Sequence, residues 1–350
     1  MPCYLINPFE DARWDKLLTR HPRASVFHTA GWLKALRQTY GYEPIAYTTT
    51  PPGADLRDAV LFCRVQSWLT GPRLVSLPFS DHCEPLVDDA ADFQIILTDL
   101  KEQLLRNRWR YFEMRPLDHI EGPQGLFHSM YSYVLHRLDL TPNLETLFRG
   151  FHKDSTQRKI RRAEREGLTY QEGTSESLLD NFYRLFLLTR RRHQLPPQPR
   201  SWFVNLAQSL GEAAKIRVAF KEGQAVAAIL TLRYKDTLVY KYGCSDARFN
   251  NLGGMHLLFW RSIEEAKKDG LRTFDLGRSG PEGAGLITFK DRWGATRSTL
   301  TYSRYTRSAR SLDNYKTTGD WTLRIARQVF SHVPDRIVAA AGQMLYKHIG

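Results

Sequence analysis

The stretch that most constrains the fold runs from Thr273 to Ala295 and reads TFDLGRSGPEGAGLITFKDRWGA. Its first residues alternate, so Phe274 and Leu276 are expected to be buried in a short strand while Asp275 faces the other way. Five glycines and charges of both signs lie in the same stretch. We therefore expect a strand whose carboxyl end, with Asp275 and Arg278, opens into a binding cleft.

The segment after that strand is expected to be a surface loop from Gly280 to Gly285, because it has no apolar period. Residues 289–294 then alternate aromatic and charged side chains. Lys290 and Arg292 next to Phe289 and Trp293 suit a phosphorylated or acyl-bearing substrate. A surface turn whose charges pair with one another explains the same residue types.

A second charged segment, residues 152–166, is expected to form one helix that faces solvent or a partner. It carries six basic and three acidic residues, and its only apolar positions are Ile160 and Ala163. A solvated charged helix is one interpretation. The surplus of positive charge also suits phosphate. The candidates for contact with a substrate phosphate or a tRNA phosphate are Arg158, Lys159, Arg161 and Arg162.

The first part of the chain alternates expected strands and helices, which indicates a mixed sheet covered by helices. Residues 78–85 interrupt this pattern as an irregular polar loop. Asp81 and His82 in that loop are candidates to line a cleft, although a turn held by local hydrogen bonds is the simpler interpretation. From Ile216 to Tyr242 the pattern predicts an antiparallel meander.

Several of these segments, taken in order, resemble the Fem-type aminoacyltransferases and the related acetyltransferase-like (GNAT) proteins of bacterial envelope biosynthesis. The strongest match is a strand ending in Asp-Leu-Gly, a glycine loop and then GLITFKDRWG. Residues 152–167 (HKDSTQRKIRRAEREG) and 240–258 (YKYGCSDARFNNLGGMHLL) fit the same pattern. Residues 25–42 and 78–86 resemble the first domain of that group, so the resemblance covers most of residues 1–305.

The resemblance implies an α+β fold of two tandem GNAT-like domains with mixed sheets flanked by helices. We place the first domain at residues 1–142, the second, with the main site, at 143–308, and a basic amphipathic helical tail at 309–350. No sustained heptad is present, so the long coiled-coil arm found in many Fem-type enzymes is not expected.

The resemblance also implies roles for individual residues. Lys290 assists the transferring group, and Arg278 and Arg292 hold a phosphate or carboxylate. Asp275 is the candidate to orient or deprotonate the acceptor, and Tyr242 is the candidate proton donor.

In the acetyltransferase fold, a strand, a glycine turn and a helix cradle a pyrophosphate through backbone N–H groups. Here Gly253 and Gly254 occupy that turn. The spacing between Arg248 and these glycines differs from the family spacing by two residues. The expectation for this turn is therefore a generic anion site.

The function implied is transfer of an acyl or aminoacyl group onto an amine or hydroxyl of a peptidoglycan or exopolysaccharide precursor. The donor is acyl-CoA or aminoacyl-tRNA, with no metal. An acetyl-CoA-dependent N-acetyltransferase acting on an envelope sugar or small amine is an alternative. A non-catalytic protein that binds tRNA or another polyanion, or a membrane-associated assembly protein, is a further alternative.

Charge and cysteine content set outer limits on these functions. Fifty Lys and Arg against 37 Asp and Glu leave a net charge of +13, which favours anionic partners such as phosphorylated precursors, tRNA or an anionic inner-membrane surface. DNA is not an expected partner. Four scattered cysteines form no metal-ligand pattern, and neither a secretory signal nor a membrane span is recognisable. A cytoplasmic protein is expected, with its tail on the membrane or on its own surface.

Overall fold

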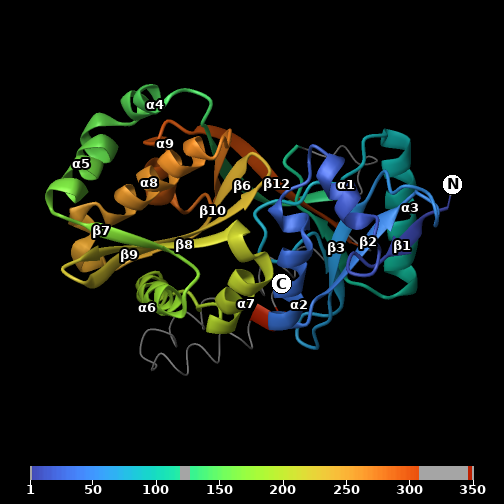
Figure 1. Cartoon of the computed structure of the whole chain (residues 1–350). Coiled ribbons are helices and arrows are strands. Elements are labelled where there is room, and N and C mark those ends of the chain that lie inside the picture. Colours follow the sequence, from blue (N-terminus) through green and yellow to red (C-terminus); the bar gives the residue numbers. More distant parts are fainter. Residues whose placement is uncertain (1, 119–126, 307–345, 349–350) are drawn as a thin grey trace. The chain divides into compact units, whose positions relative to one another are not determined.

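The computed structural model describes residues 2–118, 127–306 and 346–348. They form two compact units, coloured along the chain in Figure 1. The first unit contains residues 2–118, 127–132, 300–306 and 346–348, and the second contains residues 133–299. Each unit is a mixed sheet with helices, so the expected α+β class is confirmed.

The first unit starts with alternating short strands and helices. Its elements are β1 (Tyr4–Ile6), α1 (Trp14–Arg20), the 3₁₀ turn η1 (Val26–His28), α2 (Ala30–Tyr40), β2 (Glu43–Thr48), β3 (Val60–Val65), β4 (Arg73–Val75), α3 (Ala90–Arg106) and β5 (Tyr111–Met114). Side-chain caps begin the longer helices: Thr29 accepts from the backbone N–H of Trp32, and Asp89 accepts from two N–H groups of α3.

The second unit has its helices before and after a central meander. Its elements are α4 (Leu144–Gly150), the π-turn η2 (Lys153–Gln157), α5 (Arg158–Arg165), β7 (Thr169–Gly173), α6 (Glu176–Arg192), α7 (Arg200–Leu210), η3 (Gly211–Ala213), β8 (Ala214–Lys221), β9 (Gln224–Tyr234), β10 (Thr237–Ser245), η4 (Ala247–Leu252), α8 (Gly254–Lys268), β11 (Thr273–Ser279) and α9 (Ala284–Asp291). Two long strands, β6 (Phe127–Asp139) and β12 (Thr296–Thr306), continue from one unit into the other. The boundary expected at residue 142 lies just after β6.

The two sheets have the same strand order. In the first unit the order is β1-β2-β3-β4-β5-β12, and in the second it is β7-β8-β9-β10-β11-β6. In each described sheet one neighbouring pair is parallel, β4 with β5 and β10 with β11, and a helix connects the two strands of each pair. This shared order supports the duplication that the resemblance implied, although the sequence shows no repeat.

The last strand of each sheet comes from elsewhere in the chain. β12 follows β11 in the sequence but pairs with β5, whereas β6 follows β5 but pairs with β11. Neither half of the sequence therefore contains all the strands of its own sheet.

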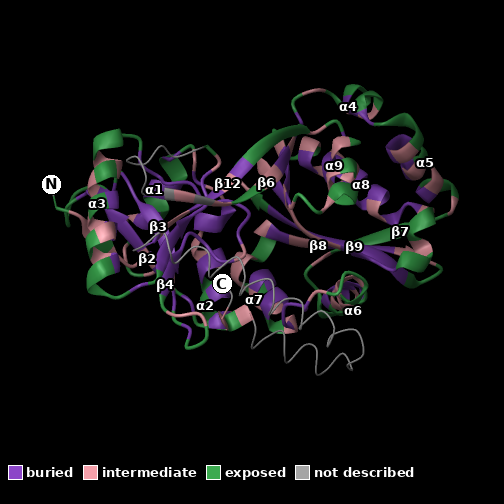
Figure 2. Cartoon of the chain, turned by 180° about the vertical axis from the view of Figure 1, so that it is seen from behind, coloured by how far each residue is buried: buried purple, intermediate pink, exposed green. Residues whose placement is uncertain are grey.

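The core of the second unit lies on both faces of its sheet. On one face α8 packs Phe259 and Ile263 against Phe274 of β11 and the fully buried Trp293. On the other face α6 and α7 pack Phe182 and Phe203 against each other. Figure 1 shows α8 and α6 on opposite sides of β8 and β9, and Figure 2 shows that α6 and α8 combine buried and exposed faces. This layering fixes the strands from which the candidate site is built.

Some elements differ from those expected. Residues 284–291 form α9, so the loop expected from Gly280 to Gly285 ends at Gly283. Leu286, Phe289 and Trp293 have helical spacing, but the glycines at residues 280–285 indicated a loop instead. The basic helix expected at residues 152–166 is a π-turn followed by α5. Strands β4, β7 and β12 were not predicted, and most of the tail at 309–350 lies outside the described residues.

Candidate active site

The candidate site lies where β10 and β11 separate. The two strands pair in parallel from Thr237 with Thr273 to Val239 with Asp275. Beyond this point β10 stays paired with β9 as far as Ser245, and β11 stays paired with β6 as far as Ser279. Both strands have a register irregularity where they part. The edges that face each other therefore open towards their carboxyl ends, next to the start of α8.

Lys290 binds the open edge of β11. Its ammonium donates to the carbonyl oxygens of Gly277 at 2.8 Å and Arg278 at 3.1 Å, and the residue is 1% exposed. Buried carbonyls need partners, so Lys290 stabilises two carbonyls of β11 just beyond the last residue that pairs with β10. The candidate catalytic lysine thus sits at the point of strand separation, held by backbone contacts.

Asp275 is fixed by the turn that opens the edge. One carboxylate oxygen accepts from the N–H of Gly277 at 2.7 Å, and the other lies 3.7 Å from the Arg137 guanidinium. Gly277 adopts a φ of +70°, which L-residues other than glycine rarely adopt. The geometry therefore supports an orienting role for the buried Asp275 in this turn.

Tyr242 and Arg278 border the same opening from β10 and β11. The Tyr242 hydroxyl oxygen accepts from the Trp202 indole N–H at 2.9 Å, which orients it. The Arg278 guanidinium lies 4.3 Å from the centre of the Tyr133 ring, within the range of a cation–π contact. Both side chains are half-buried.

A cationic cluster lies at the beginning of α8. Burial lowers the pKa of Lys159 on α5, and the positive charge of Arg292 lowers it further. Burial, with the charges of Lys159 and Arg292, also lowers the pKa of His256 to about 3, so His256 is neutral at pH 7. Neither Lys159 nor Arg292 has an acidic partner among the described residues. A positive field without a neutralising group therefore meets the amino-terminal end of α8.

The other basic candidates are distributed over a wider surface. Arg158 and Arg161 are exposed on α5, with Arg161 over the Phe148 ring, and Arg162 pairs with Glu166 on the same helix. Arg248 binds Asp246 in its own turn, with the shorter ion-pair contact at 2.6 Å. Arg162 and Arg248 therefore already have acidic partners, unlike Lys159 and Arg292.

The glycine turn before α8 is filled by protein atoms. A Cβ on Gly253, whose φ is +84°, would lie 2.3 Å from the backbone oxygen of Lys159, and a Cβ on Gly254 would lie 3.1 Å from Ala227. Close packing of α5 and the sheet thus accounts for both glycines without a bound ligand. On β10, a Cβ on Gly243 would lie 1.9 Å from the Tyr240 hydroxyl.

The two aromatic candidates on α9 and just after it belong mainly to the core. Trp293 is fully buried and stacks near Phe259, with ring centres 5.3 Å apart. Phe289 is partly buried against Phe259 and His256. Their structural role is to fix the end of α9, and with it Lys290.

Asp81 and His82 lie in the first unit, far along the chain from these residues. Both are buried in the loop between β4 and α3, and the Asp81 carbonyl accepts from the Tyr302 hydroxyl at 2.6 Å. Nearby, Cys83 lies 3.4 Å from His28, but burial raises the pKa of the thiol to about 12. This pair is therefore not a thiolate nucleophile at neutral pH.

Sequence reasoning missed a buried histidine beside Lys290. His136 on β6 is fully buried, and its Nε2 lies 3.1 Å from Asp291, which Arg297 also binds. Burial lowers the pKa of His136 despite the carboxylate. Since Asp291 directly follows Lys290, this contact fastens the end of α9 to the sheet. The alternation in β6 was a usable signal, because His136 lies two residues before the buried Leu138.

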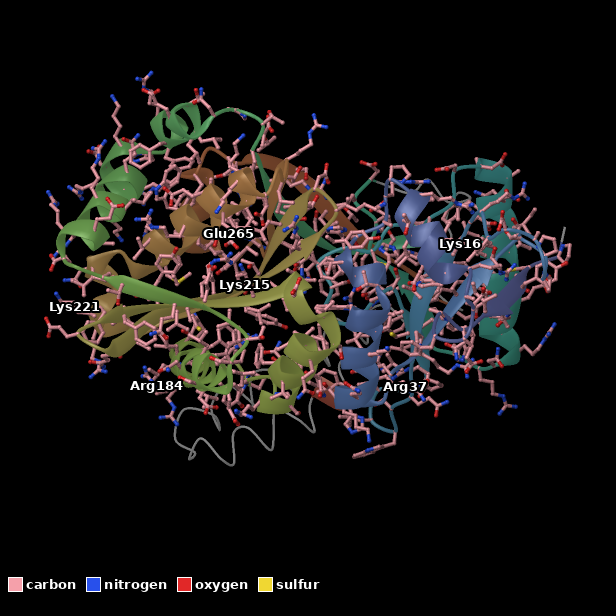
Figure 3. The ribbon with its side chains drawn as sticks, viewed as in Figure 1. Lys16, Arg37, Arg184, Lys215, Lys221 and Glu265 are labelled. Carbon is pink, nitrogen blue, oxygen red and sulfur yellow. The ribbon has the colours of Figure 1, made fainter. Side chains whose placement is uncertain are left out.

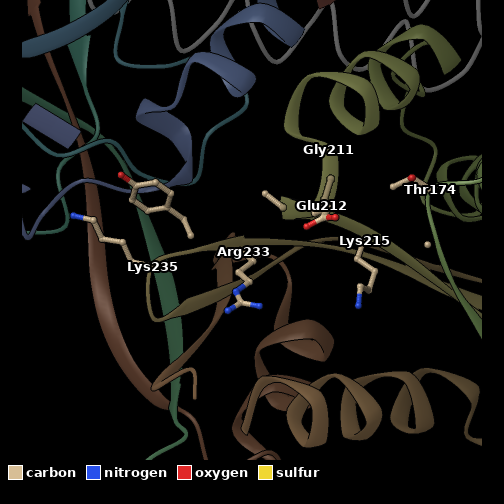
Figure 4. A pocket seen from close by; sticks show the side chains of 10 residues that line it. Thr174, Gly211, Glu212, Lys215, Arg233 and Lys235 are labelled. Carbon is tan, nitrogen blue, oxygen red and sulfur yellow. The ribbon is translucent and has the colours of Figure 1, made fainter. Parts of the chain in front are cut away.

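A hollow lies at the opposite end of this sheet from the candidate site. It has a volume of about 930 Å³ and is lined by Thr174, Glu212, Lys215, Arg233 and Lys235 among others (Figure 4). Lys215 forms an ion pair with Glu172 on β7. It also pairs with Glu265 on α8, and both of these side chains are labelled in Figure 3. This hollow lies where β10 begins, away from the separated edges.

Within residues 2–118, 127–306 and 346–348, no three or more His, Cys, Asp or Glu side chains are grouped to hold a metal ion. In the same ranges every helix is too short or too polar to span a bilayer.

Comparison with known proteins agrees with this geometry. Residues 151–291 match the acetyltransferase (GNAT) domain family. The crystal structure of FemX superposes with a TM-score of 0.68 at 14% identity, covering 91% of this chain and 99% of FemX. Residues 151–291 are thus similar to a GNAT domain, and the chain shares the fold of FemX. The matched residues contain β10, α8, β11 and α9, and therefore the separated strands with Lys290.

Other relatives extend the comparison. A UDP-N-acetylmuramoylpentapeptide-lysine N(6)-alanyltransferase from Weissella viridescens is 28% identical over 111 residues, which is 31% of this chain and 33% of that protein. The chain thus aligns with about a third of the length of this curated relative. A tandem GNAT protein from the clavulanic acid biosynthesis pathway has a TM-score of 0.56 at 10% identity, covering 88% of this chain and 99% of that chain. The resemblance inferred from the sequence, with its tandem GNAT-like fold, is confirmed.

Proposed function

We propose that this protein is an acyltransferase that moves an acyl or aminoacyl group onto an amine or hydroxyl of a cell-envelope precursor. The observation that carries the proposal is the separation of β10 and β11, with Lys290 bound to the carbonyls of Gly277 and Arg278 just beyond the last paired residue. The similarity to an alanyltransferase that acts on a peptidoglycan precursor supports the choice of acceptor class.

The reaction requires one exchange of bonds. The acceptor nitrogen or oxygen attacks the acyl carbonyl carbon, a new amide or ester bond forms, and the bond to the donor breaks. The acceptor proton ends on the leaving oxygen of a tRNA ribose or on the leaving sulfur of coenzyme A. The transition state carries negative charge on the carbonyl oxygen, which a nearby fixed cation stabilises.

The chain's residues suit the parts of this reaction. Lys290 keeps the edge of β11 apart from β10 and places a positive charge beside the reacting carbonyl. Asp275 orients the turn at Gly277. Tyr242 donates its proton to the leaving group and regains one from the acceptor. Arg278 holds a charged group of the acceptor.

The donor's phosphates are proposed to lie at the start of α8, against Lys159 and Arg292. These two side chains have no acidic partner among the described residues, and a helix amino terminus favours anions. The exposed arginines of α5, Arg158 and Arg161, extend this surface for a longer donor. Both acyl-CoA and aminoacyl-tRNA carry phosphates, so this surface suits either donor.

The test measures donor consumption by the unmodified protein and by two matched double variants. Purified protein is incubated with labelled acetyl-CoA or with labelled alanyl-tRNA, together with a UDP-linked muramoyl pentapeptide. We expect one donor to be consumed and its label to appear on the precursor. The variant K159A/R292A is expected to raise the donor KM at least about tenfold, because two phosphate contacts are lost.

The control K268A/R272A removes the same charge from exposed positions at the other end of α8 and in the turn after it, and is expected to leave KM unchanged. Equal effects of the two double variants would show that only net charge matters and would contradict the proposed donor surface. If the unmodified protein transfers label from neither donor, the proposed reaction itself is contradicted.

The non-catalytic alternative is favoured by one observation, the exposed basic face of α5. In that case tRNA would bind with a steep dependence on salt. Salt-dependent tRNA binding without transfer from any donor would select this alternative.

A further inference from the structure

The turn between β3 and β4 exposes large apolar side chains. Trp68 is 84% exposed and Leu69 is 52% exposed. Leu105, in the last turn of α3, is 63% exposed. A tryptophan this open to water is unfavourable in a protein that has no partner for it, because its large ring gains most from burial.

The turn is rigidly supported, so this exposure is built into the fold. Within the turn, the N–H of Gly71 donates to Ser67 at 2.7 Å, and the N–H of Thr70 donates to the Ser67 hydroxyl at 2.9 Å. Residues 346–348 also hold the turn. The His348 carbonyl accepts from the Thr70 hydroxyl at 2.7 Å and from the Arg73 guanidinium at 2.8 Å.

Topology places a basic segment at the same edge of the first unit. β4 and β5 are parallel, so the segments that precede them, residues 66–72 and 106–110, lie at the same end of the sheet. Direct contacts confirm this, since Arg110 donates from its side chain to the Thr70 carbonyl and from its backbone to the Pro72 carbonyl. The turn at residues 66–72 and the basic segment at residues 106–110 therefore form one continuous surface.

The two segments that form this surface carry only positive charges. Arg106, Arg108 and Arg110 are exposed, and no acidic residue occurs in either of the sequence ranges 64–80 and 103–112. Lys347, beside the supporting His348, is also exposed. An exposed tryptophan and leucines beside arginines match the interface of an anionic bilayer, where tryptophan lies at headgroup depth and arginine binds lipid phosphate.

We propose that the surface formed by Trp68, Leu69, Leu105, Arg106, Arg108 and Arg110 binds the protein to anionic lipid membranes. Trp68 and Leu69 enter the interface, and the arginines contact the headgroups. This surface differs from the tail at residues 309–350, to which the sequence assigned a membrane contact, although Lys347 lies beside it. The inference does not depend on the proposed transferase reaction.

The test uses vesicles and the full chain. Flotation with vesicles of 70% phosphatidylcholine and 30% phosphatidylglycerol is compared with pure phosphatidylcholine, at low and high salt. We expect binding to the anionic vesicles that weakens as salt rises. The variants W68S/L69S and R106Q/R108Q are each expected to lower the partition coefficient at least about tenfold, because each removes one of the two contributions.

The matched controls are L5S, which removes another exposed leucine of the first unit, and K16Q/K34Q, which removes two exposed charges from its helices. Both are expected to bind like the unmodified protein. Because all substituted side chains are exposed, thermal unfolding midpoints should be unchanged, and this check excludes misfolding as the cause of lost binding.

Two results would overturn the proposal. One is equal binding of W68S/L69S and the unmodified protein, or no preference for anionic vesicles. The other is a dimer, measured by light scattering, that W68S/L69S dissociates, because this would assign the surface to a second copy of the chain.

Discussion

Replacing Lys290 with methionine tests whether this lysine holds the separated strands in place. Methionine keeps a flexible apolar stem but removes the ammonium, so the carbonyls of Gly277 and Arg278 lose the donor that lies 2.8 and 3.1 Å away. Each buried carbonyl left without a partner costs about 1–3 kcal/mol. The ammonium no longer has to be desolvated, which offsets part of this cost.

The net expectation is a loss of about 3 kcal/mol in the free energy of unfolding. With a urea dependence of about 1–3 kcal/mol per molar, the unfolding midpoint falls by about 1 M or more. The measurement is urea denaturation followed by circular dichroism and tryptophan fluorescence. The control is Lys268→Met, an exposed lysine of α8, which should leave the midpoint near that of the unmodified protein.

A midpoint for Lys290→Met equal to that of the control would refute this reasoning, since the two carbonyls would then not depend on the lysine. If the midpoint falls as expected, the transfer rate is measured under conditions where the variant is still folded. A separate loss of rate then reports the charge of Lys290 at the reacting carbonyl.

The remaining predictions concern buried charge and tight packing. Arg304 and Arg115 hold the pKa of the buried Glu113 at about 2, below its ordinary 4.5. A carboxyl with a lowered pKa contributes stability above pH 4.5 that is lost as the pH falls towards 2, here about 3 kcal/mol. Glu113→Gln should remove this acid dependence from the unfolding free energy. Gly253→Ala places a methyl group 2.3 Å from a backbone oxygen, whereas Gly270→Ala, also at positive φ, meets nothing within 4 Å. Calorimetry should show a loss of about 1 kcal/mol for the Gly270 variant and a clearly larger one for the Gly253 variant; equal losses would contradict the packing argument.

Regular patterns in the sequence predicted the local structure well. The alternation at residues 216–242 predicted the meander of β8, β9 and β10. Such elements are predictable because apolar alternation and turn residues act between neighbours in the sequence. The sequence could not predict that β12 completes the first sheet and β6 the second, because long-range pairing leaves no periodic signal in either strand.

For the candidate site, the sequence singled out Asp275 at the end of a strand and, through the family resemblance, Lys290. The fold brings both to the same turn of β11, while their roles stay predictions. Individual residue types did not reveal that Trp293 is enclosed by α8, since burial depends on which helix covers the sheet. The contact of His136 with Asp291 joins residues distant in sequence, so only the folded chain shows it.

The most direct test of the central claim is to follow the acyl group itself. Mass spectrometry of a phosphorylated envelope precursor, after incubation with the protein and either acyl-CoA or aminoacyl-tRNA, should show one added acyl or aminoacyl group. That product should fall sharply with Lys290→Met under folding conditions and persist with Lys268→Met. An unchanged precursor with both donors, or equal product from both variants, would contradict acyl transfer between β10 and β11.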